Sequence, residues 1–171
     1  MGQFLGFVAI DASIKATIMT KNSSGVPVDA TAGPTYRVYG PTGIMANGTG
    51  SMSAKDSGTV TGATNASPIV ITSANHGLTT GMRVTVASVG GNTAANSDWT
   101  ITRVDSNTFS LDSSTGNGAY TSGGTWHAAG LYAFNFTPTA ANGFAAGVNY
   151  YVVVNATISS NVGDVYNFLV T

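Results

Sequence analysis

The chain contains no cysteine and no glutamate. The missing cysteine excludes disulfide bonds, thiolate metal sites and cysteine nucleophiles. Without glutamate, seven aspartates are the only acidic side chains, and they stand singly along the sequence. A hydrolase that works with a pair of carboxylates is therefore disfavoured.

Charge of either sign is scarce. Charged residues make up 8% of the 171 residues, against about 25% in an average soluble protein. The net charge is -1 and the few Lys and Arg residues are scattered, so no basic patch marks a nucleic-acid or anionic-membrane partner. No uninterrupted apolar run approaches the roughly 18 residues of a membrane helix. We therefore expect neither nucleic acid nor membrane as a partner, whereas self-association is favoured because little like-charge repulsion opposes it.

What the chain has instead is the two-residue period of β-strands, punctuated by 22 glycines. The apolar residues of 10–18 fall on one face of a predicted strand, and Tyr150, Val152 and Val154 share one face of another. With 43% hydrophobic residues, the chain can form a packed core. We predict an all-β fold, with at most one helical turn within residues 139–146.

Residues 59–126 have a pattern of strands and turns that differs from that of the flanking segments. They contain five short predicted strands joined by tight turns, which suits a small β-barrel. The flanking segments together contain about six or seven strands, which suits an immunoglobulin-like β-sandwich. We therefore predict a discontinuous sandwich formed by 1–58 plus 127–171, with the barrel 59–126 inserted into it. A module carried on a loop of another domain indicates display or scaffolding before catalysis.

The titratable residues form no recognisable catalytic or metal-binding pattern. His76 lies in a turn with no acid within several residues, so its predicted role is to bond the backbone. His127 directly follows Trp126 and is expected to pack at the module boundary. The loop 112–117 is the nearest approach to a calcium site, but it holds one carboxylate. We predict no catalytic residue, no metal site and no cofactor, and expect that the protein is not an enzyme.

An apolar segment near residue 1 is a candidate contact between subunits. An equally good interpretation is that this segment is only the first strand of the sandwich. The residues of this candidate assembly contact are Gln3, Phe4, Leu5 and Phe7.

Three aromatic residues of the predicted barrel are candidates for stacking on sugar rings. Packing in the core or at the barrel mouth is the commoner fate of such side chains. These candidate ligand-stacking residues are Trp99, Tyr120 and Trp126.

Several strings within 59–126 are specific. They are SPIVIT at 67–72, HGLTTG at 76–81, VTV at 84–86, GNTAAN at 91–96, WTIT at 99–102, NTFSL at 107–111 and GAYTSGGTW at 118–126. In these strings the segment resembles modules of tailed-bacteriophage proteins. Such modules are described as similar to the small β-barrel half-domain beside the first catalytic cysteine of ubiquitin-activating enzymes. The resemblance implies a fold and no activity, because this chain has no cysteine.

The flanking segments share a looser pattern, carried by residues 14–20, 22–27, 36–39, 130–132, 144–154 and 165–170. In this pattern they resemble a second phage family, of small β-sandwich proteins encoded among virion structural genes. Together the two resemblances imply a component of the virion.

The resemblances imply a non-enzymatic virion structural protein, made in the host cytoplasm. The first expectation is a capsid decoration (cement) protein, whose sandwich binds the shell and whose barrel projects outward. The alternative is a tail, neck or baseplate component whose barrel touches a neighbour or a host glycan. A carbohydrate-binding adhesion module is a third class. The expected partners are the major capsid protein or tail and neck proteins, and further copies of the chain as a homo-oligomer.

Overall fold

The computed structural model describes residues 3–158, 161–162 and 165–170, with side chains for 9–158. The chain forms two compact units. The sandwich unit comprises Met1–Ser53 and Gly130–Thr171, and the inserted unit comprises Ala54–Ala129. The predicted insertion, residues 59–126, lies within the second of these.

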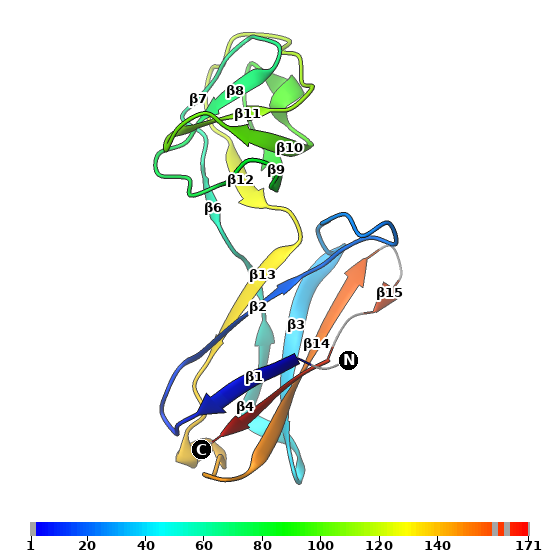
Figure 1. Ribbon diagram of the computed structural model, residues 1–171, viewed down its shortest axis with the longest axis vertical. Coiled ribbons are helices and arrows are strands. Elements are labelled where there is room, and N and C mark those ends of the chain that lie inside the picture. The colour runs from blue at the N-terminus through cyan, green and yellow to red at the C-terminus, as the bar shows by residue number, and fades with distance from the viewer. Residues whose placement is uncertain (1–2, 159–160, 163–164, 171) are drawn as a thin grey trace. The chain divides into compact units, whose positions relative to one another are not determined.

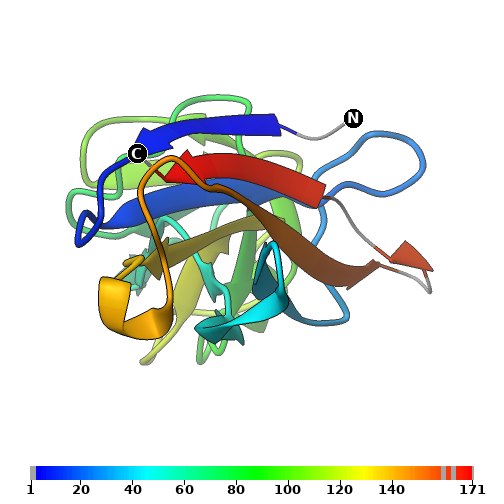
Figure 2. The ribbon, with the colours of Figure 1, turned by 90° about the horizontal axis from the view of Figure 1, so that it is seen from below.

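The sandwich unit is built around a six-stranded sheet. Its order is β1-β16-β14-β3-β4, with β15 added beside β14. The first strand runs parallel to β16, and Figure 2 shows the two side by side, blue beside red. The bounds are β1 Gln3–Val8, β3 Ala32–Gly40, β4 Gly43–Ser51, β14 Asn149–Ile158, β15 Asn161–Val162 and β16 Val165–Val170.

A smaller sheet has the order β2-β13-β5, formed by β2 (Ile14–Met19), β13 (Leu131–Phe136) and β5 (Ser53–Ala54). The first two pair without a break along their whole length. The alternation that predicted a strand over 10–18 extends beyond the strand itself, which begins at Ile14. A positive φ of 65° at Asp11 interrupts the extended backbone before it.

The core of the sandwich unit follows the predicted alternation. Tyr150, Val152 and Val154 on β14 are buried, and Tyr36 on β3 stacks on Phe134 of β13 with ring centroids 4.6 Å apart. The single predicted helical turn is the short 3-10 helix η2, Ala140–Asn142. The fold is all-β as predicted, and two facing sheets with this strand order form an immunoglobulin-like β-sandwich.

The inserted unit contains one seven-stranded sheet in the order β6-β12-β9-β10-β11-β8-β7. Its two end strands follow each other along the chain with only Val60 and Thr61 between them. The two ends of the sheet are therefore close together, and the sheet is curled into a half-barrel (Figure 1). The bounds are β6 Ser57–Thr59, β7 Gly62–Ala63, β8 Ile69–Thr72, β9 Arg83–Ala87, η1 Thr93–Ala95, β10 Asp98–Arg103, β11 Thr108–Leu111 and β12 Thr125–Ala128.

The inserted unit has its own core. Inward residues of its strands, such as Ile71, Ile101 and Phe109, are fully buried, and no residue of this cluster belongs to the core of the sandwich unit. The chain enters through β6 and leaves through β12, and these two strands pair antiparallel from Ser57↔His127 to Thr59↔Thr125. The insertion therefore begins and ends at adjacent strands (Figure 1).

Candidate functional site

Trp126, one of the three candidate stacking residues, lies in the core of the inserted unit. It is 2% exposed, and its indole N–H donates to the hydroxyl of Ser73 over 2.7 Å. The ring meets Phe109 edge-to-face, with centroids 5.9 Å apart. On the paired strand, a Cβ at Gly58 would come within 2.8 Å of the indole nitrogen. The surroundings leave no face of this ring for a sugar, and core packing is the role that the structure gives Trp126.

Trp99 and Tyr120 are half-buried and pack against the same core. The indole N–H of Trp99 donates to the carbonyl oxygen of Ala95 over 2.8 Å. The hydroxyl of Tyr120 lies 3.1 Å from the carbonyl oxygens of both Val60 and Gly123. Both polar groups therefore bind loops of the unit itself, although part of each ring remains exposed. Sugar stacking by these two residues stays a prediction.

His76 is the turn histidine that the sequence predicts. Its Nδ1 accepts the backbone N–H of Leu78 over 3.0 Å, and its Nε2 lies 3.0 Å from the carbonyl oxygen of Asp105. Since Nδ1 is an acceptor, the proton of the neutral ring sits on Nε2 and is donated to that carbonyl. The side chain is buried against Phe109. Both ring nitrogens thus hold two turns together.

Asp105 forms the neighbouring turn. Its carboxylate accepts the backbone N–H of Asn107 over 2.7 Å. That bond, with further ones from Thr108 and a smaller effect of His76, holds the pKa of the Asp105 carboxyl below its usual value. The aspartate is therefore a turn residue, in the turn that joins β10 to β11.

Two asparagines join separate segments of the inserted unit by hydrogen bonds. Asn92 is fully buried, where its Nδ2 donates to the carbonyl oxygen of Thr64 and its Oδ1 accepts the backbone N–H of Asn117. Asn117 in turn accepts from the backbone N–H of Ala94 and donates to the hydroxyl of Thr93. Sequence reasoning missed this structural set. The signal was available, because Asn92 follows Gly91 and Asn117 stands between two glycines, a setting typical of loops.

In the loop 112–117, considered for calcium, the hydroxyl of Ser114 is bonded within the inserted unit. The hydroxyl of Ser114 is buried, donates to the carbonyl oxygen of Leu111 and accepts the backbone N–H of Ile69. Within the described part of the chain, no three His, Cys, Asp or Glu side chains are grouped so that they could hold a metal ion.

A polar row crosses the outer surface of the inserted unit. Strand pairing places His127 of β12 beside Thr85 of β9, and Thr85 beside Asp98 of β10. The Thr85 hydroxyl donates to the Asp98 carboxylate over 2.7 Å, and Arg83 lies 3.6 Å from the same carboxylate. His127 is half-buried. The side-chain contacts of Thr85 and Arg83 with Asp98 join β9 to β10, and contacts of this kind stabilise a sheet.

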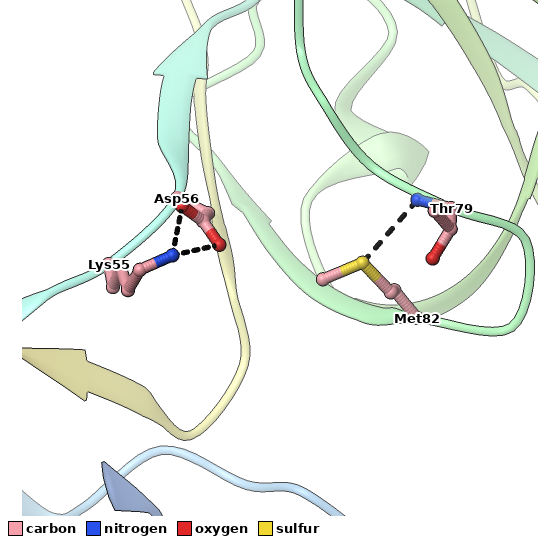
Figure 3. Close-up of polar contacts among 4 residues, drawn as sticks. All are labelled: Lys55, Asp56, Thr79 and Met82. Carbon is pink, nitrogen blue, oxygen red and sulfur yellow. Dashed lines mark hydrogen bonds and ion pairs between the residues drawn. The ribbon is translucent and has the colours of Figure 1, made fainter. Parts of the chain in front are cut away.

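Another ion pair joins two neighbours in the chain. Lys55 contacts the carboxylate of its neighbour Asp56 at 2.7 Å, and both side chains are 42% exposed. Figure 3 shows this pair together with the contact of the Thr79 backbone N–H to the Met82 sulfur, 3.4 Å long. An exposed pair of this kind contributes little to stability.

The candidate assembly contact, Gln3, Phe4, Leu5 and Phe7, forms strand β1. It lies at one end of the six-stranded sheet and pairs with β16 from Gln3↔Tyr166 to Val8↔Val170. The backbone of this segment thus forms a strand of the sandwich. Its side chains lie outside the described residues, so a contact between subunits stays a prediction.

No protein-family model matches this chain, and no curated protein matches it. Among the described residues, no helix has the length and apolar character to cross a membrane. Function is therefore inferred from the architecture and surface chemistry of the chain, together with the resemblances of its segments.

Proposed function

We propose that this protein is a non-enzymatic structural component of a phage virion, in the first place a capsid decoration protein. The observation that carries the proposal is the insertion of one compact unit between β5 and β13 of a β-sandwich. The insertion is entered and left through the paired strands β6 and β12. In this role the sandwich unit binds the shell and the inserted unit is the part displayed.

The separation of the two cores supports the assignment of shell binding to one unit and display to the other. The buried apolar residues of the sandwich unit form one cluster, and those of the inserted unit form another. Each unit can therefore change its surface without disturbing the interior of the other. A protein that binds a capsid lattice through one unit and displays the other unit needs two units whose cores are independent.

The surface chemistry also suits assembly. Only 8% of the residues are charged, so contact between copies meets little electrostatic repulsion. A decoration protein needs a modest interface, about 800 Å² per partner, because repetition on a lattice multiplies weak contacts. No catalytic residue takes part in such a role.

Location and copy number on purified virions test the proposal. Because the chain has no cysteine, Val104→Cys, at a side chain that is 59% exposed, creates one reactive thiol for a gold label. Virions carrying the unsubstituted protein are the matched control for labelling of other proteins. We expect label over the whole head, with a copy number that follows the capsid lattice.

Two other outcomes have different meanings. A small number of copies confined to the neck, tail or baseplate would overturn decoration and favour the alternative, a connector or host-contact component. Absence of the protein from purified virions would overturn the virion proposal altogether.

A further inference from the structure

The outward face of the large sheet in the sandwich unit is unusually poor in charge. The six strands β1, β3, β4, β14, β15 and β16 contain a single charged residue, Arg37, and no acidic one. Arg37 is exposed, because the neighbouring residues Tyr36 and Val38 point into the core. An exposed sheet face normally carries many charged side chains, so this one differs from an ordinary solvated surface.

Large apolar side chains lie on this face in a row. Strand pairing places Ile44 of β4 beside Tyr39 of β3, and Tyr39 beside Tyr151 of β14. Ile44 is 52% exposed and Tyr151 41% exposed. The two tyrosine rings are stacked, with centroids 5.1 Å apart and planes within 4° of parallel. In the next row, Arg37 pairs with Val153.

This combination matches the centre of a protein–protein interface. Such centres are depleted in charged residues and enriched in tyrosine and arginine, which carry most of the binding energy. Because Tyr39 and Tyr151 already hold each other in place, little side-chain entropy remains to be lost on binding. Exposed threonines, Thr35 and Thr49, supply a polar rim.

The edges of the same sheet are less suited to binding a partner. At one end the pairing of β1 with β16 shifts between Phe4 and Phe7, and at the other the pairing of β3 with β4 shifts between Arg37 and Tyr39. Bulges of this kind disrupt the regular row of backbone groups that an added strand would need. The face, and not an edge, is therefore the surface available for docking.

We propose that this face, centred on Tyr39, Tyr151 and Arg37, docks onto a different protein whose surface is apolar and places a carboxylate opposite Arg37. A symmetric pair of copies would set the face against itself. Since its strands contain no acid, the guanidinium of Arg37 would then be desolvated without an anion, which is costly. The inference rests on the proposed function in taking that partner to be another virion protein.

Photo-crosslinking in cells that produce the assembled particle identifies the protein that docks on this face. Tyr151→p-benzoylphenylalanine places the crosslinker on the face, and Met19→p-benzoylphenylalanine is the matched control. Met19 is similarly exposed, at 46%, on β2 of the other sheet. We expect position 151 to crosslink to one different protein, at a segment that contains Asp or Glu, and position 19 to give no such product. Products joining two copies of this chain at position 151, or no product there, would overturn the proposal.

Charge reversal tests the role of Arg37. We expect Arg37→Glu to reduce the crosslinked product and the copy number on particles at least about tenfold, with unchanged thermal unfolding because the side chain is exposed. Replacing the crosslinked partner's carboxylate by Arg should restore both. Full incorporation of Arg37→Glu into virions would overturn the docking face while leaving the proposed function standing. A partner that is lost with Arg37→Glu but is not a virion protein would support the face and overturn the virion assignment.

Discussion

The indole N–H of Trp126 and the hydroxyl of Ser73 form a 2.7 Å hydrogen bond inside the inserted unit, where both side chains are 2% exposed. Ser73→Ala would leave the indole N–H buried without an acceptor. We expect the inserted unit to lose about 1–3 kcal/mol of unfolding free energy. Urea unfolding followed by tryptophan fluorescence measures it, because both tryptophans of the chain lie in this unit. The exposed Ser97→Ala is the control, and equal midpoints for the two variants would contradict the assignment.

The two cores predict two separable unfolding transitions. Phe109→Ala should destabilise the inserted unit by about 3–5 kcal/mol, because this ring is fully buried there. Phe134→Ala should act in the same way on the sandwich unit. Fluorescence should follow only the first change, whereas far-UV circular dichroism should report both. A single transition that both variants shift equally would show that the units unfold together.

Substitutions at two glycines with positive φ allow the cost of backbone strain to be compared with the added cost of steric overlap. Gly77 has φ +67° and open space where a Cβ would stand, so Gly77→Ala should cost about 1–2 kcal/mol. Gly91 has φ +78°, and a Cβ there would overlap the carbonyl oxygen of Ala119. Gly91→Ala should therefore cost clearly more. The same fluorescence titration compares them, and equal costs would contradict the tight approach at Gly91.

The lowered pKa of Asp105 predicts a pH dependence. Because the folded state favours the carboxylate, this group adds stability above its ordinary pKa of 3.8, and the addition is lost as pH falls through the lower folded pKa. Asp105→Asn keeps an oxygen that accepts from Asn107 but removes the charge. The variant should be less stable than the parent near neutral pH, and the difference should shrink in acid. Stability measured for both chains across this range checks it, and a difference independent of pH would contradict it.

Local periodicity determined much of the fold in advance. Alternation over Ile14–Ile18 and Tyr150–Val154 predicts which side chains are buried, because neighbouring residues of a strand point to opposite faces. The same local reasoning separates the inserted segment from its flanks, since each has its own set of apolar strands. The position of His76 in a predicted turn, with no acid nearby in the sequence, also predicts that it bonds the backbone. In the structure it does so at both ring nitrogens.

The fate of the aromatic residues was decided by the tertiary structure. Trp99, Tyr120 and Trp126 are equivalent candidates by sequence, yet only Trp126 is fully enclosed. The ring of Trp126 is enclosed by Phe109, by Ser73 and by the close backbone of Gly58, whereas the other two aromatic rings stand at the margin of the core. Which strands become neighbours depends on packing over the whole unit, and a short sequence window does not contain that information.

Tyr39 and Tyr151 show the same division most clearly. Each residue's own strand determines that its ring points outward, and the scarcity of charge around Arg37 can be counted in the sequence. That the two rings stack depends on the register between β3 and β14, which are far apart in the chain. Register is set by the core that these strands bury together on their other face, so only the folded sheet brings the two tyrosines into one surface.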